Sequence, residues 1–451
     1  MRNKRLLIVI VVIMLFSILL FGIRLYMLSI SDQIGYGTLD NLSETVAEES
    51  APAIYPEDEN VIDEEHKNAV VSEGDAGLEN NTVGQEELFL GSENSDRTQK
   101  NAWIEDKIAS MTVEEKVAQL FMLSPEKLTG VDHVSAAGNI TKDAIDAFPV
   151  GGLIYFESNI ESPHQIMEMI ANTQSYALNR IEIPMFIAVD EEGGYVTRIA
   201  KNSSFDVPAF PYANELGLSG DADVAFEMGF AIGEYLEFYG FNVDFAPVAD
   251  VLSNPENQVV KKRSFGSDAQ LVSDMVLAEL DGLKSHNIVG CVKHFPGHGA
   301  TAGDTHEGYA YTEKTWEELL ACEVVPFSNS VAMDVPMIMI GHISLPNVVG
   351  DHTPASMSYC MITEHLRDEL GYDGIVITDS LEMRAITDSY SSKQAVVNVL
   401  KAGGDMFLDP TDFKSAYEGI LSEIASGDIS EERIDESVYR ILNVKYELLK
   451  K

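Results

Sequence analysis

The sequence predicts an α/β protein with a single (β/α)8 barrel of the TIM type, preceded by an N-terminal membrane anchor and a disordered acidic tether. Three observations lead to this prediction. Eight short apolar runs alternate with helix-length stretches between residues 101 and 451, clusters of polar residues follow five of these runs, and an uncharged N-terminal segment precedes an acidic one. Barrels of parallel strands show this alternation, and their functional side chains follow the strand ends.

The first expected element is a membrane span over residues 6–23, which carry no charge and consist mainly of Leu, Ile, Val and Phe. A segment of this length can cross an apolar layer of about 30 Å and exceeds the ~7–15 apolar residues of a signal peptide. Because Arg2, Lys4 and Arg5 precede it, the positive-inside rule places the remainder of the chain outside the cell. We expect residues 1–30 to be an uncleaved signal anchor; the alternative is a cleaved export signal and a secreted protein.

The second element, residues 31–100, is expected to be a disordered tether. It carries 18 acidic and three basic residues and has no sustained apolar period, so it cannot bury enough surface to fold. The whole chain of 451 residues has a formal net charge of −43, which argues against nucleic acid as a partner because phosphates would be repelled. The three cysteines form no CxxC pair and exclude a fold held by disulfides.

The third element, residues 101–451, is the predicted barrel. Its expected strands are residues 119–123, 151–156, 185–189, 242–245, 288–292, 337–340, 375–378 and 405–408. Helix starts are indicated by Ser162-Pro163 and by capping boxes that begin at Thr112, Ser267 and Thr315. Gly240 is expected to end a helix over 221–239. Only helix-length stretches follow the last strand, so we expect one folded domain. We also expect a monomer.

Polar clusters come directly after five of the predicted strands. They are the segments Asp190–Gly194, Ala246–Asp250, Lys293–Gly299, Gly341-His342 and Asp379–Met383. Because the carboxyl ends of parallel barrel strands meet at one end, we expect these side chains to line one site.

The richest segment, KHFPGHGATAGDTHEG from Lys293 to Gly308, admits several interpretations. Its histidines and Asp304 are metal-ligand types, but Pro296 and the glycines would break the helix needed to bring His294 and His298 onto one face. We therefore expect no metal and no cofactor. Histidines that only satisfy loop hydrogen bonds explain one or two of the set.

Acid/base chemistry is the other interpretation of this segment. A histidine can exchange protons near neutral pH, and a carboxylate two residues away can orient it, which makes His306 and Asp304 a candidate dyad. Asp379, at the end of the seventh predicted strand, is a candidate nucleophile. A helix N-cap is the alternative role for Asp379.

Several motifs occur in one order: DEEGGYVTR at 190–198, FAPVAD at 245–250, RSFG at 263–266, KHFPGHG at 293–299, DTH at 304–306 and TDSLEM at 378–383. With these motifs, residues 101–451 resemble the family-3 glycoside hydrolases, in the branch of retaining β-N-acetylglucosaminidases (β-N-acetylhexosaminidases). The resemblance implies a (β/α)8 catalytic domain.

The resemblance to this family also implies roles for individual residues. Asp379 would attack the anomeric carbon to form a covalent glycosyl–enzyme intermediate, while His306 would act as acid and base and Asp304 would orient it. Five residues would bind the terminal N-acetylglucosamine: Asp190, Arg198, Arg263, Lys293 and His294. We expect a supporting role, without sugar contact, for Glu192, Asp250, Cys291, His298, His342 and Asp409.

The expected function is exo-hydrolysis of terminal non-reducing N-acetylglucosamine from peptidoglycan fragments or chito-oligosaccharides by an extracellular, membrane-anchored enzyme. Two alternatives stay open. One is a phosphorylase, because a histidine would not repel an incoming phosphate as a carboxylate would. The other is a non-catalytic cell-wall-binding module, which the intact Asp379, Asp304 and His306 disfavour.

Overall fold

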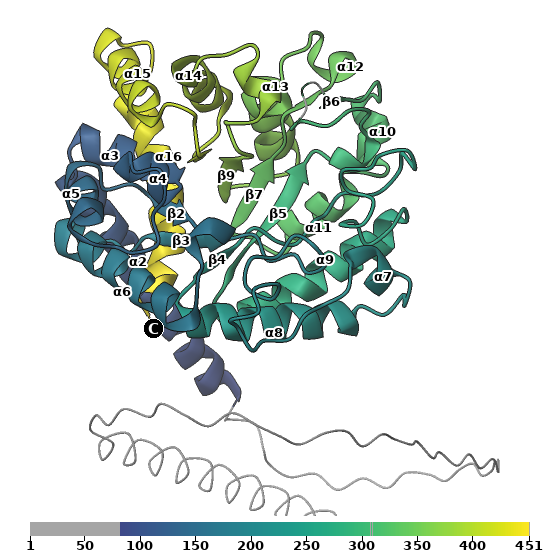
Figure 1. Ribbon diagram of the computed structural model, residues 1–451, viewed down its shortest axis with the longest axis horizontal. Coiled ribbons are helices and arrows are strands. Elements are labelled where there is room, and N and C mark those ends of the chain that lie inside the picture. Colours follow the sequence, from purple (N-terminus) through teal and green to yellow (C-terminus); the bar gives the residue numbers. More distant parts are fainter. Residues whose placement is uncertain (1–81, 307, 309, 451) are drawn as a thin grey trace, which may run out of the picture. The chain divides into compact units, whose positions relative to one another are not determined.

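The computed structural model describes residues 82–306, 308 and 310–450, and within them the predicted barrel is present (Figure 1). Eight parallel strands follow one another in the order β10-β1-β2-β3-β4-β5-β7-β9. Their bounds are β1 Phe121–Leu123, β2 Gly152–Ile154, β3 Phe186–Val189, β4 Val243–Asp244, β5 Val289–Phe295, β7 Met337–Ile340, β9 Ile375–Thr378 and β10 Phe407–Leu408. Between β9 and β10 the pairing is reduced to one bridge, Ile377–Met406, so the barrel is nearly closed.

All eight strands overlap predicted apolar runs, because their residues are buried on both faces of the barrel wall and are mostly apolar. β5 is the main difference. It continues to Phe295 and has an irregular register between Lys293 and Phe295, so Lys293 and His294 lie within the strand rather than after it. A second, two-stranded sheet of β6 (Ala310–Tyr311) and β8 (Ile343–Ser344) was not predicted.

Helices surround the barrel and cover its outer face (Figure 1). The α-helices are α2 Thr82–Ser110, α3 Val113–Gln119, α4 Pro125–Thr129, α5 Asn139–Ala147, α6 Pro163–Ile181, α7 Ala213–Gly217, α8 Asp223–Tyr239, α9 Ala269–Lys284, α10 Trp316–Leu320, α11 Val325–Ala332, α12 Pro346–Val349, α13 Arg384–Thr387, α14 Ser392–Ala402, α15 Phe413–Ser426 and α16 Glu431–Leu448. Shorter helical turns are η1 Glu157–Asn159, η2 His298–Ala300 and η3 Ala355–Met357, and η4, Cys360–Glu369, is a π-helix.

Most of the predicted helix ends are confirmed. Capping boxes are present at Thr112 and Thr315, Ser162 caps α6, and α8 ends at Gly240 in the left-handed conformation. The predicted box at Ser267 is wrong. Asp268 caps α9 instead, because its carboxylate accepts hydrogen bonds from the backbone N–H groups of Gln270 and Leu271.

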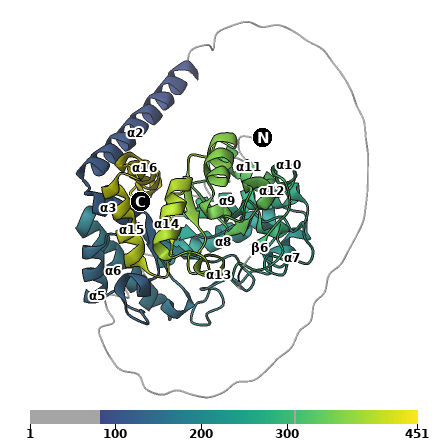
Figure 2. The same cartoon turned by 90° about the horizontal axis from the view of Figure 1, so that it is seen from above.

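The predicted boundary between tether and barrel, at residue 101, needs correction. Helix α2 extends from Thr82 to Ser110, so the last part of the predicted tether is helical. Figure 2 shows α2 beside α16, and the Trp103 and Tyr446 rings lie 5.4 Å apart while Lys100 pairs with Glu447 at 2.9 Å. Packing on a distant helix therefore stabilises a segment whose own sequence shows little amphipathic period.

The predicted membrane span, residues 6–23, and the first part of the tether lie outside the described residues. Within residues 82–306, 308 and 310–450, no helix is both long and apolar enough to cross a membrane.

Candidate active site

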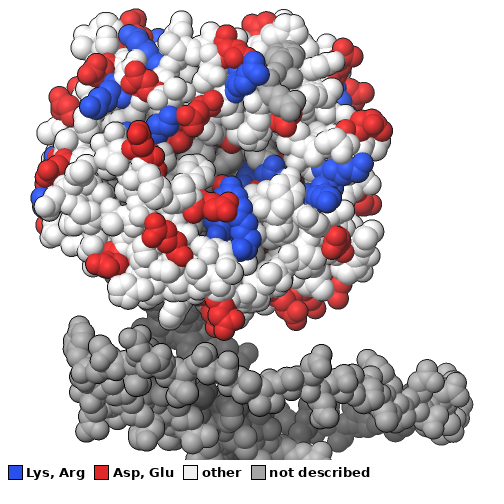
Figure 3. All heavy atoms as spheres, viewed as in Figure 1, with Lys and Arg blue, Asp and Glu red and all other residues white. Residues whose placement is uncertain are grey.

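A cavity of about 1180 Å³ opens at the carboxyl ends of the barrel strands. Figure 3 shows it as a hollow near the centre of one face, with basic and acidic side chains at its edge. All eight residues that were predicted to form the site line this cavity: Asp190, Arg198, Arg263, Lys293, His294, Asp304, His306 and Asp379. The barrel brings them together because β3, β5 and β9 and the loop after β4 all end at this face.

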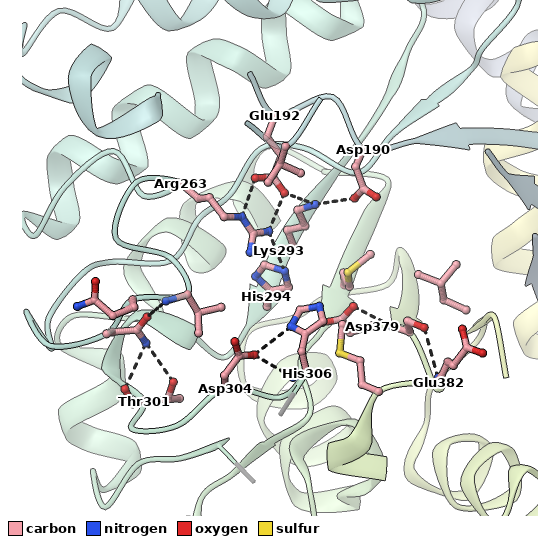
Figure 4. Close-up of a pocket in the computed structure, with 18 of the residues that line it drawn as sticks. Asp190, Glu192, Arg263, Lys293, His294, Thr301, Asp304, His306, Asp379 and Glu382 are labelled. Carbon is pink, nitrogen blue, oxygen red and sulfur yellow. Dashed lines mark hydrogen bonds and ion pairs between the residues drawn. The ribbon is translucent and has the colours of Figure 1, made fainter. Parts of the chain in front are cut away.

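On one wall of the cavity, Glu192 contacts two of the residues that were predicted to bind the sugar (Figure 4). Its carboxylate accepts two hydrogen bonds of 2.7 Å from Arg263 and lies 2.6 Å from the Lys293 ammonium. Burial alone raises the pKa of Glu192, but the two cations outweigh it and lower this pKa to about 2. Lys293 likewise stays charged, because burial lowers its pKa less than the Glu192 carboxylate raises it.

Asp190 directly follows β3 and lies next to this cluster. One carboxylate oxygen lies 3.0 Å from Lys293 Nζ, and the other lies 3.4 Å from Arg198 Nη2. The loop that carries Arg198 is held by Glu191, for which no role was predicted. Buried Glu191 accepts hydrogen bonds from the backbone N–H groups of residues 198, 199 and 200 and from the Tyr235 hydroxyl. It therefore sets the position of Arg198.

His294 is oriented by the buried carboxylate of Asp250. The His294 Nδ1 lies 2.7 Å from one carboxylate oxygen of Asp250, and the other oxygen accepts the backbone N–H groups of His294 and His298. Although burial opposes it, the histidines lower the pKa of Asp250. Because the ionised Asp250 carboxylate lies at Nδ1, the ring proton is held on that nitrogen. The Nε2 atom is on the opposite side of the ring, facing the cavity and 3.5 Å from Arg263 Nη2. The supporting role predicted for Asp250 is confirmed.

Asp379 follows β9 at the floor of the cavity and is almost fully buried. One oxygen accepts the backbone N–H of Ser380 at 2.7 Å. Burial raises the pKa of the Asp379 carboxyl, but the fields of His294, His342 and Lys293 together with the Ser380 hydrogen bond lower it below its ordinary value. Asp379 is thus an ionised carboxylate with an oxygen left for chemistry.

His306 and Asp304 lie on the loop after β5. Asp304 Oδ1 lies 3.0 Å from His306 Nδ1 and accepts the His306 backbone N–H at 2.9 Å (Figure 4). These bonds from His306 outweigh burial and lower the pKa of Asp304. The His306 side chain is 60% exposed and lines the cavity. The predicted dyad is therefore assembled.

The base of this loop is closed by a two-way backbone pairing of Ala302 with Tyr311, at 2.9 and 3.0 Å. Just before it, the carbonyl of Thr301 accepts the side-chain amides of Asn254 at 2.9 Å and Asn257 at 3.2 Å. The Asn257 amide also donates to the carbonyl of His298 at 2.8 Å. The loop after β4 thus holds the loop that carries the dyad.

The histidines of the KHFPGHG and DTH motifs contact two different aspartates. His294 and His298 contact Asp250 through different atoms, while His306 pairs with Asp304. Within the part of the chain that the structure describes, no three His, Cys, Asp or Glu side chains are arranged to hold a metal ion.

Several cavity residues were not predicted. Glu192 and Asp409 were expected only to support the site, yet both line the cavity. Tyr195, Asn254 and Asn257 also line the cavity, and no role was predicted for them. Tyr195 lies inside the DEEGGYVTR motif, which was the available signal; the two asparagines had none, because their partners are about 45 residues away along the chain.

Fold and site together define a parallel-barrel protein of the enzyme type: a buried carboxylate and a histidine–aspartate pair face one polar cavity at the carboxyl ends of the strands, where barrel enzymes carry their catalytic residues. The profile of the glycosyl hydrolase family 3 N-terminal domain matches residues 112–444. The chain belongs to this family, within the branch of the β-hexosaminidases and β-N-acetylglucosaminidases.

Individual relatives agree with this assignment. Beta-hexosaminidase A of Pseudoalteromonas piscicida is 32% identical over 68% of this chain and 55% of its own length. Beta-hexosaminidase LpqI of Mycobacterium tuberculosis is 32% identical over 58% of this chain and 68% of its own length. The structure of a family-3 β-N-acetylglucosaminidase from Paenibacillus sp. FPU-7 superposes with a TM-score of 0.70 at 36% identity, over 75% of this chain and 62% of that one. This chain thus spans little more than half of the first relative.

Proposed function

We propose that this protein is an exo-acting β-N-acetylglucosaminidase that hydrolyses terminal N-acetylglucosamine with retention of configuration. The observation that carries the proposal is the common cavity of Asp379 and the Asp304–His306 pair, with the Asp379 carboxylate buried and ionised. Relatives named β-hexosaminidase and β-N-acetylglucosaminidase support the choice of sugar.

In the first step, a carboxylate oxygen of Asp379 attacks the anomeric carbon and forms the glycosyl–aspartate bond. The bond between that carbon and the leaving oxygen breaks, and His306 gives its Nε2 proton to the leaving oxygen. Asp304 stabilises the cationic ring before this transfer through the 3.0 Å contact at Nδ1. Using a histidine here avoids a second carboxylate next to Asp379, where like charges would raise a carboxyl pKa.

In the second step, His306 takes a proton from a water molecule whose oxygen attacks the anomeric carbon. The bond to Asp379 breaks, and the carboxylate and the protonated histidine are restored. Two displacements on opposite faces return the original anomer.

The sugar is bound by donors and acceptors that are already in place. Asp190 and the His294 Nε2 atom accept hydroxyl hydrogens, and the cations Arg198, Arg263 and Lys293 donate to sugar oxygens. Ion pairs hold Arg263 and Lys293 in position, so little reorganisation is needed on binding. No cofactor takes part in these steps.

Natural substrates are proposed to be peptidoglycan fragments or chito-oligosaccharides. We also propose that residues 6–23 anchor the protein in a membrane with the barrel outside the cell, and that it acts as a monomer. The net charge of −43 opposes the approach of a phosphate anion, which favours hydrolysis over phosphorolysis.

The test is product analysis on chitobiose and on muropeptides, with and without inorganic phosphate. The proposal expects free N-acetylglucosamine, released first as the β-anomer and unaffected by phosphate. Release of the α-anomer would contradict the covalent route, glycosyl phosphate would indicate a phosphorylase, and no release from either substrate would contradict the activity.

A further inference from the structure

Tyr195 presents a half-exposed aromatic ring on the wall of the cavity. It is 50% exposed, although the neighbouring side chains of Glu192 and Lys293 are almost fully buried. It occupies the tip of the turn after β3, where Gly193 and Gly194 have φ values of +80° and +59°. Glycine adopts such values without strain, which lets the turn be this tight.

Both sides of this turn are held firmly. Before the tip, Glu192 is bound by Arg263 and Lys293, and its backbone N–H donates to the Val196 carbonyl at 2.8 Å. After the tip, the backbone of residues 198–200 is held by Glu191. The position of Tyr195 is therefore set by the barrel.

A second tyrosine supports the ring. The Tyr195 and Tyr212 centroids are 5.9 Å apart with an angle of 60° between the rings, and the Lys262 ammonium lies 4.4 Å from the Tyr212 centroid. A Cβ atom at Gly194 would come within 2.5 Å of the Tyr212 ring. The glycine thus permits a packed pair of tyrosines with one ring turned to the cavity.

The cavity becomes more exposed from floor to mouth. The Lys293 side chain is 3% exposed and Asp379 is also buried, whereas the His306 side chain, proposed to protonate the leaving oxygen, is largely exposed. Tyr195, at 50% exposed, resembles His306 rather than the buried residues and is therefore assigned to the mouth of the cavity. At about 1180 Å³, the cavity exceeds the ~300–1,000 Å³ that encloses a typical small ligand. Space is available beyond the reacting sugar.

We propose that Tyr195 is the platform of a second subsite, which binds the sugar ring on the leaving-group side by stacking against its apolar face. This rests on the proposed exo-glycosidase function and specifies its substrate: an oligosaccharide with a second pyranose ring next to the terminal N-acetylglucosamine. Rigid aromatic side chains supply such contact area at small entropic cost.

The kinetic test compares chitobiose with methyl β-N-acetylglucosaminide, which has an alkyl leaving group but no second ring. Tyr195→Ala is expected to lower kcat/KM for chitobiose about 3- to 10-fold, the size of an aromatic contact, and that for the methyl glycoside less than 2-fold. Tyr195→Phe should keep the chitobiose value because the ring is retained. Tyr359→Ala, a tyrosine 56% exposed outside the cavity, is the matched control. Equal losses on both substrates, or none on chitobiose, would overturn the subsite.

A binding measurement separates this subsite from the proposed catalysis. Calorimetry on the Asp379→Ala protein should give tighter binding of chitobiose than of N-acetylglucosamine, and Tyr195→Ala in that background should remove the difference. If the wild type proved inactive but this difference persisted, the hydrolase proposal would fail and the subsite would stand. Equal binding of the two sugars before Tyr195 is changed would overturn the subsite even in an active enzyme.

Discussion

Glu192 and Arg263 are joined by two parallel hydrogen bonds of 2.7 Å each, although 71 residues separate them along the chain. The same carboxylate contacts Lys293 at 2.6 Å. Two cations assigned to the sugar are thus held by a buried anion before any ligand binds. Such preorganisation lowers the cost of forming the bound geometry.

Glu192→Gln should therefore reduce both stability and sugar affinity. Removing one partner of a buried charge cluster leaves the others uncompensated and typically costs about 3–5 kcal/mol. We expect this loss in the free energy of unfolding by urea titration, together with a raised KM. Glu182→Gln is the control, because the Glu182–Lys107 pair of 2.7 Å lies at the surface and should change stability by less than about 1 kcal/mol. Equal stability of the two variants would contradict the role of Glu192.

Asp379→Ala and His306→Ala should fail in different ways. Without Asp379, both chemical steps are lost, and added azide should give an α-glycosyl azide by direct displacement. Without His306, azide should attack the intermediate and give the β-azide. Acid/base help is worth about 10²–10⁴ in rate, and this loss should appear mainly on chitobiose and less on an aryl glycoside with a good leaving group. The same azide anomer from both variants would contradict the assigned roles.

Asn257→Ala should act on the reaction through the His306 loop. Its amide holds the carbonyls of His298 and Thr301, and its oxygen accepts the backbone N–H groups of residues 259 and 260. We expect faster amide hydrogen exchange across residues 302–306 and, as for His306→Ala, a larger loss of kcat on chitobiose than on an aryl glycoside. The control is Asn329→Ala, which removes a 2.7 Å bond to Ser273 between α11 and α9. An equal loss on both substrates would show a general structural effect.

Asp409 should make stability depend on pH. Burial raises the pKa of this carboxyl from 3.8 to about 6, even though it accepts hydrogen bonds from Ser124. The folded protein therefore holds the proton more tightly than the unfolded chain, and stability falls as the pH rises from about 4 to above 6. Asp409→Asn removes this penalty, so its stability relative to wild type should increase by about 2–3 kcal/mol between pH ~4 and pH ~8. Parallel pH–stability curves for the two proteins would contradict the raised pKa.

The sequence by itself determined the barrel and eight of the residues that line its cavity. Strands buried on both faces must be apolar throughout, so runs such as residues 337–340 and 375–378 were predicted with their observed bounds. Caps at Thr112 and Thr315 were predictable because a capping box joins groups only three residues apart. Once strands are parallel, their carboxyl ends must share a face, so the polar residues after them meet in one cavity.

Only the tertiary structure decided how these residues are paired. Glu192 contacts Lys293 across 101 positions, Asn257 contacts Thr301 across 44, and α2 is stabilised by α16 from the other end of the domain. Contacts of this kind have no local sequence signature, since each partner alone is an ordinary polar or helical residue. The extension of β5 to Phe295 has the same origin, because β7 provides hydrogen-bond partners for a stretch whose composition indicates a loop. Closure of the barrel, which depends on all eight strands together, selects these partners.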